Sequence, residues 1–240
     1  MTIQPFKLVP NTPVALVLDF DGTITELDVV DALLVGFAQG TAWIEAEKAW
    51  ARGAISSAEC LRKQLGSVRI GSKEISEFLK TIPPDPSFAA LRKYAGKMRV
   101  PLLVLSDGFD ILIRKFFNLQ GIRGVPFRSN TLRHSGERFR PSFPHKERSC
   151  GKCAHCKGAT LAEIRPLVRH IVFVGDGLSD ACAVRSADTV FAKGKLAAFC
   201  EKSEAPFRRY DDLGDVLDQL PELLRRFKKR VPAHEKIARS

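Results

Sequence analysis

Long apolar runs, internal repeats and low-complexity linkers are all missing from this 240-residue chain. No apolar stretch reaches the ~18 residues that a membrane-spanning helix needs, so no membrane partner is expected. Residues 1–13 also lack the basic, apolar and small-residue segments of a secretory signal. We therefore expect a cytoplasmic protein, and its 45% of apolar residues is ordinary for a globular one.

Disulfide cross-links are not expected either. The chain has six cysteines, and the thiols of a cytoplasmic protein stay reduced. Cys60, Cys182 and Cys200 lie within apolar helical patterns and are predicted to be small residues of the core. The other three cysteines lie within seven residues of one another.

The chain carries a formal net charge of +11. A basic surface attracts nucleic acid, anionic membranes or small phosphorylated molecules. Part of the excess lies near the end of the chain, in Arg225, Arg226, Lys228, Lys229 and Arg230. We find neither a stacking platform nor a base-reading helix, so these charges favour a solvated basic face over a nucleic-acid site.

Three short apolar runs predict strands that are buried on both faces, which is typical of a parallel sheet. Each run ends at a small polar turn: Asp19-Phe-Asp-Gly22, Ser106-Asp-Gly108 and Gly175-Asp-Gly177. Ligands of open α/β sheets bind beyond the carboxyl ends of the strands. The sequence therefore predicts a doubly wound, mostly parallel α/β fold with its chemistry at these three turns.

Residues 28–95 are helical in pattern and too long for an ordinary crossover between two strands. We predict that they form an inserted helical cap domain on a core made of residues 1–27 and 96–240. Trp43 and Trp50 recur at helical spacing and are expected in the core of this cap. Asp28, at the start of this segment, is expected either to face the leaving group of a substrate or to be a solvated surface charge. Residues 125–143 alternate like a short hairpin, and helices and strands alternate after them.

The strongest chemical signal is Asp19-Phe-Asp-Gly-Thr23. Two carboxylates at i and i+2 after a buried strand leave its end in the same direction, and Mg²⁺ is usually held by one or two carboxylates plus substrate phosphate. When Mg²⁺ neutralises the negative charge of the carboxylates, Asp19 can approach an anionic phosphorus, attack it and form an aspartyl phosphate. Asp21 can protonate the leaving alkoxide and then deprotonate the attacking water.

Other polar residues follow the same pattern. Asp176 and Asp180 follow a second buried strand and offer further acidic ligands for a metal. Ser106 follows a third, and its hydroxyl with the Gly108 amide suits phosphate oxygens. Lys157 opens a helix after a turn and offers a point charge for a phosphoryl group.

In this chain order the motifs resemble those of the haloacid dehalogenase superfamily. The resemblance implies that Asp19 is the nucleophile and Asp21 the acid/base. It implies that Asp19, Asp176 and the backbone carbonyl of Asp21 bind Mg²⁺, with Asp180 ordering a metal-bound water. The residues that it implies for the substrate phosphate are Ser106, Asp107, Gly108 and Lys157.

Within the superfamily, the helical insertion resembles the small cap of the phosphoserine-phosphatase-like branch. Asp19 to Thr25, Gly53 to Cys60 and the pair Cys156-Lys157 are most similar to the 2-hydroxy-3-keto-5-methylthiopentenyl-1-phosphate phosphatases of methionine salvage. Asp107 departs from the Ser-Gly-Gly of phosphoserine phosphatases and is closer to the phosphoethanolamine/phosphocholine phosphatases. The resemblance thus implies a phosphatase acting on a small phosphorylated metabolite, or a phosphotransferase or mutase using the same aspartyl phosphate.

Cys150, Cys153 and Cys156 lie just before Lys157, with His145 and His155 nearby. Three thiolates and one imidazole form a structural zinc set, which would anchor the loop that carries the lysine. The same residues also fit reduced loop thiols or a reversible Cys150–Cys153 link. Together with the basic net charge, such a zinc site would also fit a nucleic-acid-binding module, which is the non-enzymatic alternative. A module of that kind would not need the acidic motifs at Asp19 and Asp176, which argue against it.

Overall fold

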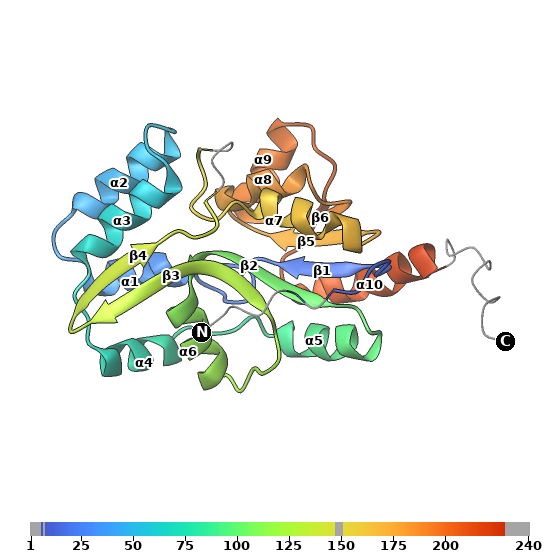
Figure 1. The fold of residues 1–240 in the computed structure, drawn as a ribbon, viewed down its shortest axis with the longest axis horizontal. Coiled ribbons are helices and arrows are strands. Elements are labelled where there is room, and N and C mark those ends of the chain that lie inside the picture. Colours follow the sequence, from blue (N-terminus) through green and yellow to red (C-terminus); the bar gives the residue numbers. More distant parts are fainter. Residues whose placement is uncertain (1–5, 7, 147–150, 229–240) are drawn as a thin grey trace.

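A seven-stranded sheet with the order β4-β3-β2-β1-β5-β6-β7 forms the centre of the molecule (Figure 1). The computed structural model describes residues 6, 8–146 and 151–228. The strands are β1 (Ala15–Leu18), β2 (Leu102–Phe109), β3 (Phe127–Ser135), β4 (Arg138–Ser142), β5 (Ile171–Gly175), β6 (Thr189–Ala192) and β7 (Arg208–Arg209). Neighbouring strands are parallel except for the antiparallel pair β3–β4, so the mostly parallel α/β fold and the predicted hairpin are confirmed.

Helices cover both faces of the sheet. They are α1 (Val29–Phe37), α2 (Ala42–Ala51), α3 (Ser57–Ser67), α4 (Ser72–Lys80), α5 (Phe88–Lys97), α6 (Asp110–Leu119), α7 (Lys157–Ile164), α8 (Ala181–Val184), α9 (Gly194–Lys202) and α10 (Leu213–Lys228), with 3₁₀ turns η1 (Arg165–Leu167) and η2 (Leu178–Asp180). In Figure 1, α5 and α6 lie on one side of the sheet and α7, α8 and α9 on the other. This two-sided arrangement is the doubly wound architecture that the sequence predicts.

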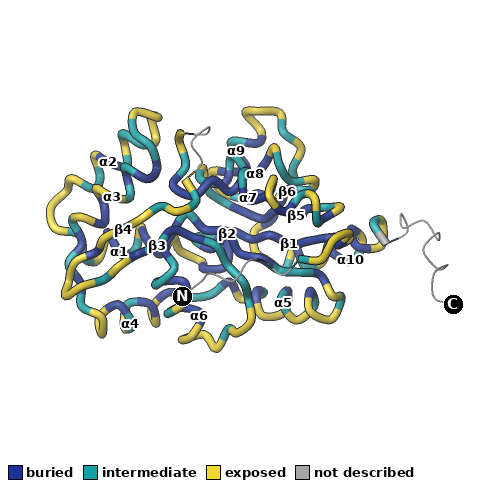
Figure 2. Tube along the Cα trace, viewed as in Figure 1, coloured by how far each residue is buried: buried dark blue, intermediate teal, exposed yellow. Residues whose placement is uncertain are grey.

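The alternation of side chains along β1 explains why both faces are covered. All of its residues are fully buried. Leu16 and Leu18 pack into the apolar layer with α5, α6 and α10, whereas Ala15 and Val17 pack into the layer with α7, α8 and α9. Figure 2 shows the central strands as a buried band between exposed helical surfaces.

The segment predicted to be a cap, residues 28–95, contains helices α1 to α4 and most of α5, which ends at Lys97. Helix α2 packs on α3, and α3 contacts β4, so this pair stands beyond the sheet edge in Figure 1. Helix α4 instead packs on α6, and α5 packs on α10. The last part of the segment thus shares the helical layer of the sheet, and its division into cap and core stays a prediction.

The carboxyl ends of β2, β1 and β5 meet at one edge of the sheet. Leu18 at the end of β1 is in register with Val104 of β2 and Val174 of β5. The predicted turn at 106–108 is wrong in one respect, because β2 continues through it to Phe109. A register shift between Leu105 and Phe109 accommodates the irregular backbone while pairing with β3 resumes.

No helix within the described ranges is both long and apolar enough to cross a membrane. The basic cluster near the end of the chain begins on α10, where Arg225 and Arg226 are exposed and Arg226 pairs with Glu222 at 2.5 Å. Lys229 and Arg230 lie outside the described residues. This placement agrees with a solvated basic face at the start of the cluster.

Candidate active site

Asp19 and Lys157 form a buried ion pair at the end of β1. The Lys157 Nζ atom lies 2.6 Å from Asp19 Oδ1, and the lysine side chain is fully buried. Residues that precede α7 bring Lys157 to the site, because the lysine is the first residue of that helix. Asp19 Oδ1 also accepts a hydrogen bond from the backbone N–H of Phe20, which fixes the carboxylate relative to the strand.

Asp180 and Asp176 complete an acidic group around this pair. Lys157 donates a hydrogen bond of 2.5 Å to Asp180 Oδ1, while Asp180 Oδ2 accepts from the backbone N–H groups of Asp176 and Gly177. Asp176 accepts from the Thr23 hydroxyl at 3.2 Å. One carboxylate oxygen from each of Asp19, Asp176 and Asp180 lies within 4.8 Å of the others.

The electrostatics of this group show an excess of negative charge. Burial raises the pKa of Asp19 well above its ordinary value, and Asp180 adds to the rise, while Lys157 opposes it. Burial together with Asp180 raises the pKa of Asp176 to about 6. Burial acts to lower the pKa of Lys157, but Asp180 and Asp19 outweigh it and raise that pKa. Three carboxylates facing one ammonium group are therefore under-neutralised, as expected for a cation site.

Asp21, two residues after Asp19, lines the same cavity as Asp19 at this strand end. Its Oδ1 accepts from the Val29 N–H at 3.1 Å, and its Oδ2 accepts from the Ser106 hydroxyl at 3.1 Å. Burial raises the pKa of Asp21 to about 6, although the hydrogen bonds from Val29 and Ser106 act to lower it. A carboxyl group with this pKa can both give and take a proton near neutral pH.

Two glycines let the backbone approach these carboxylates. Gly22 has φ of +72°, and a Cβ there would lie 2.4 Å from Asp176 Oδ2. A Cβ on Gly108 would lie 2.6 Å from Asp21 Oδ2 and 2.9 Å from Ser106 Oγ. The Gly108 N–H donates to that same Ser106 oxygen at 2.8 Å. Glycine at 22 and 108 is thus a steric requirement of the acidic site.

Asp107 lines the cavity together with Asp19 and Gly108, and its carboxylate is engaged by neighbouring protein groups. Its carboxylate accepts from the Ser57 hydroxyl at 2.5 Å and from the His155 N–H at 2.5 Å, and Asn130 Nδ2 lies 3.4 Å away. Contact with phosphate at this residue would have to come from its backbone, because the carboxylate is itself an anion. The side chain instead joins helix α3 to strand β2.

A cavity of about 360 Å³ opens above the acidic group. Its walls come from α1, α2, α3 and the segment after β5, and include Asp28, Glu47, Trp50, Gln64 and Lys195. The prediction that Trp50 belongs to the cap core is therefore wrong, whereas Trp43 packs against the apolar core. Glu47 and Trp50 share one face of α2 by their i, i+3 spacing, a signal that could have suggested a lining face.

The predicted zinc ligands are only partly brought together. Cys150 lies outside the described residues. His155 is fully buried, and its two ring nitrogens contact the Ser106 carbonyl and the Thr160 hydroxyl, each at 3.0 Å. Burial lowers the pKa of His155 to about 3, so the ring is neutral and occupied by these contacts. The prediction of His155 as a zinc ligand is wrong for this reason.

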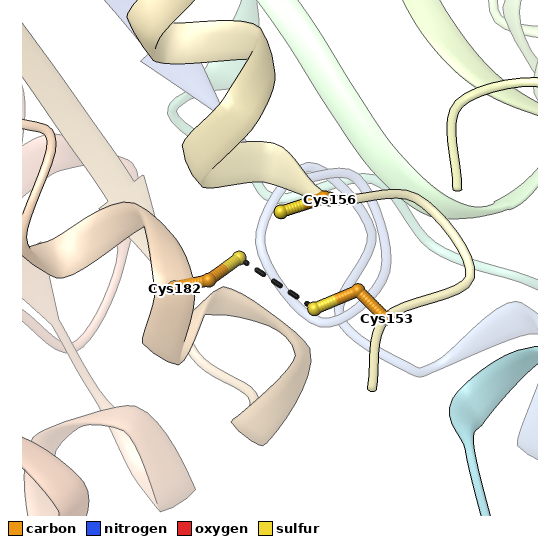
Figure 3. Close-up of side chains that lie close together, drawn as sticks. All are labelled: Cys153, Cys156 and Cys182. Carbon is orange, nitrogen blue, oxygen red and sulfur yellow. Dashed lines mark hydrogen bonds between the residues drawn. The ribbon is translucent and has the colours of Figure 1, made fainter. Parts of the chain in front are cut away.

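The His145 ring packs against the ring of His155, with centroids 5.0 Å apart, and among the described residues it is not part of the cysteine group that could hold a metal. Cys153 and Cys156 instead meet Cys182, which the sequence had assigned to the core. The Cys153 thiol donates to Cys182 Sγ at 3.8 Å, and this hydrogen bond lowers the pKa of Cys182 to about 6. Figure 3 shows the three sulfurs pointing toward one another.

Known proteins resemble this chain over most of its length. It is 30% identical over 217 residues to a 2-hydroxy-3-keto-5-methylthiopentenyl-1-phosphate phosphatase of Geobacillus thermodenitrificans, covering 87% of this chain and 96% of that protein. It is 28% identical over 218 residues to Pdp3-interacting factor 1 of Schizosaccharomyces pombe, covering 85% and 93%. A probable phosphoserine phosphatase from Vibrio cholerae shares its fold with a TM-score of 0.68 at 18% identity, covering 94% and 70%.

The mostly parallel α/β fold and the phosphatases that resemble this chain together identify it as a phosphatase of the haloacid dehalogenase type. The profile of the family described as Putative Phosphatase matches residues 14–197. Because the match spans more than half of the sequence, the chain belongs to this family. The superfamily resemblance predicted from the motifs is confirmed.

Proposed function

We propose that the protein is a Mg²⁺-dependent phosphatase that hydrolyses a small phosphate monoester through an aspartyl phosphate on Asp19. One observation supports this most: Asp19 lies at the base of a cavity, between Lys157 and further carboxylates, with Asp21 beside it. This arrangement supports a reaction in which Asp19 attacks a phosphoryl group that enters the cavity, Asp21 transfers the proton and the Lys157 ammonium group binds phosphoryl oxygens.

The acidic donor set fits Mg²⁺. Asp19, Asp176 and Asp180 oppose a single ammonium group, which leaves an excess of two negative charges, and carboxylate oxygens are the ligands that Mg²⁺ prefers. In our proposal Asp19, Asp176 and the Asp21 carbonyl hold the ion, and Asp180 orders a water. When bound, Mg²⁺ neutralises these carboxylates so that an anionic substrate can approach.

The described residues supply the remaining chemistry. A carboxylate oxygen of Asp19 attacks phosphorus, the bond from phosphorus to the leaving oxygen breaks, and an aspartyl phosphate forms. Asp21 gives its proton to the leaving alkoxide and then takes one from the water that hydrolyses the aspartyl phosphate. Lys157, the Ser106 hydroxyl and the backbone at Gly108 hold the phosphoryl oxygens.

The insertion would select the leaving group. We propose that residues 28–95 act as a cap, because α2 and α3 contribute Glu47, Trp50 and Leu61 to the cavity wall. The hydrogen bond from Ser57 to Asp107 couples this cap to the catalytic strand β2. A closed cap would exclude water from the reacting phosphoryl group.

The first candidate substrate is the phosphate ester of methionine salvage. Relatives named for that activity match this chain over 95% and 96% of their own length. Val30, Trp50 and Leu61 give the cavity an apolar wall that suits a methylthio chain.

Phosphocholine or phosphoethanolamine is the second candidate, favoured by a different observation. The carboxylates of Asp28, Asp31 and Glu47 also line the cavity and would attract a cationic leaving group. Phosphoserine is less favoured, because Lys195 is the one basic residue among the described cavity-lining residues, and the surrounding carboxylates would repel a substrate carboxylate.

A substrate comparison with purified protein and Mg²⁺ tests these candidates. We expect the highest kcat/KM for the methylthiopentenyl phosphate, at least about tenfold above phosphoserine, which corresponds to about 1.4 kcal/mol. If an amine-bearing ester is preferred, Glu47→Gln should lower kcat/KM for phosphoethanolamine and leave p-nitrophenyl phosphate unaffected. A preference for phosphoserine would contradict the proposed substrate class.

The glycine after Asp107 provides a steric test. In Gly108→Ala the new methyl group would collide with the Asp21 and Ser106 oxygens at 2.6 and 2.9 Å, so the acid/base must move. We expect kcat for p-nitrophenyl phosphate to fall about 100-fold, the usual cost of misplacing a catalytic group by about 1 Å. Gly96→Ala is the matched control, since nothing lies within 4 Å of a Cβ at that helical position. Equal kcat in both variants would show that Asp21 is not where catalysis requires it.

A further inference from the structure

Three cysteine side chains from two separate segments converge beside the active site. Cys153 and Cys156 belong to the turn before α7, and Cys182 belongs to α8. Their sulfur atoms all lie within 4.8 Å of one another, and those of Cys153 and Cys182 are 3.8 Å apart (Figure 3).

The separation of the sulfurs distinguishes between ways of joining them. A disulfide requires an S–S distance of about 2.05 Å. Thiolates bound tetrahedrally to zinc at about 2.3 Å lie about 3.8 Å from one another. The distance of 3.8 Å between Cys153 and Cys182, which a thiol hydrogen bond spans in this structure, excludes a disulfide and fits two ligands of one zinc ion.

The surroundings of the sulfurs are also those of a ligand set. The backbone N–H of Gly158 donates to Cys182 Sγ at 3.3 Å, and such outer contacts orient metal ligands. Cys156 is 5% exposed, whereas Cys153 borders a second cavity of about 170 Å³ shared with Lys152 and Ser179. An ion can therefore enter from the Cys153 side, and a solvent molecule has room to be the fourth ligand.

We infer that Cys153, Cys156 and Cys182 bind one zinc ion that fastens the turn before Lys157 to helix α8. Three thiolates are soft ligands, which select zinc over magnesium. The ligand set differs from the one that the sequence predicts, since Cys182 takes the place of the histidines. The inference rests on cysteine geometry and not on the proposed reaction.

Such an ion would link the segment that carries Lys157 to the segment that carries Asp180. Cys156 directly precedes Lys157, and Cys182 follows Asp180 by two residues. The ammonium of Lys157 and the carboxylate of Asp180 meet at 2.5 Å on the active-site side. The zinc is a positioning element in this arrangement, because it contacts neither substrate nor nucleophile.

Metal analysis of the purified full-length chain tests the inference. Protein prepared under reducing conditions, without added zinc, should contain about one zinc per chain by mass spectrometry of the metal. Cys182→Ser is the decisive variant and should lose at least about 90% of that zinc. Cys200→Ser, which changes a fully buried cysteine of α9 outside the cluster, should keep it.

Two further measurements distinguish the loss of a zinc ligand from the loss of the fold. Circular dichroism and gel filtration must show that Cys182→Ser is folded. Wild-type protein reconstituted with Co²⁺ should show thiolate-to-cobalt charge-transfer absorption, which needs no variant at all. Both readouts are independent of phosphatase activity, so the zinc inference can fail while the proposed function stands, and the reverse.

Three results would overturn the inference. The first is metal-free reduced protein, or protein holding copper instead of zinc. The second is a disulfide between Cys153 and Cys182 in a non-reducing peptide map. The third is a folded Cys182→Ser variant that retains its zinc while Cys150→Ser loses it, because the ion would then be held by the neighbouring cysteines in the sequence alone.

Discussion

Replacement of Asp19 by asparagine should lower kcat for every phosphate monoester by at least about 1,000-fold, equivalent to about 4 kcal/mol of transition-state stabilisation. The amide that replaces the carboxylate is a poor nucleophile toward phosphorus, and it also removes one anionic ligand of the cation. The measurement is steady-state hydrolysis of p-nitrophenyl phosphate at saturating Mg²⁺.

The fold should survive this change. Asparagine has nearly the same shape as aspartate, and Lys157 keeps its short contact with Asp180. The thermal midpoint should therefore stay within a few degrees of the wild type, and Asp218→Asn, at an exposed position of α10, controls for the chemistry of the substitution. A folded Asp19→Asn protein with near wild-type kcat would rule out Asp19 as the nucleophile.

Removal of divalent cations should abolish turnover almost completely. Without Mg²⁺ the carboxylates of Asp19, Asp176 and Asp180 repel one another and the substrate. Burial first, and the charge of Asp180 second, raise the pKa values of Asp19 and Asp176. Dialysis against EDTA should therefore stop hydrolysis, and addition of Mg²⁺ should restore it. Ca²⁺ should restore it poorly, because it is larger and takes more ligands in a looser geometry.

The zinc content of the same samples provides the control. If zinc is retained through dialysis, recovery with Mg²⁺ alone reports on the acidic site and not on the cysteines. Full activity after exhaustive chelation, with no Mg²⁺ left in the protein, would contradict the proposed role of the carboxylates.

The central part of the site was predictable because it depends on local sequence. Asp19, Ser106 and Asp176 each lie at or beyond the end of a continuous apolar run, and such runs form central parallel strands. Once β2, β1 and β5 are neighbours, their carboxyl ends must share one edge of the sheet. The meeting of these three residues therefore follows from the pattern of the strands.

Other features depend on how distant segments pack and leave little trace in the sequence. Cys182 fits an apolar helical pattern, and only the packing of α8 beside the start of α7 turns its thiol toward Cys153. His155 stands among cysteines in the sequence, yet the fold buries it against Thr160. Trp50 has the spacing of a core residue but lines the cavity, because α2 extends beyond the sheet.

The central claim is that Asp19 carries the phosphoryl group, and trapping the intermediate tests it most directly. In Asp21→Asn no base activates the water, but p-nitrophenolate leaves without protonation, so an aspartyl phosphate should accumulate. We expect a burst of about one p-nitrophenolate per chain and, after borohydride reduction and peptide mapping, homoserine at position 19. Absence of a burst, with unmodified Asp19 in a folded and metal-loaded protein, would contradict the covalent mechanism.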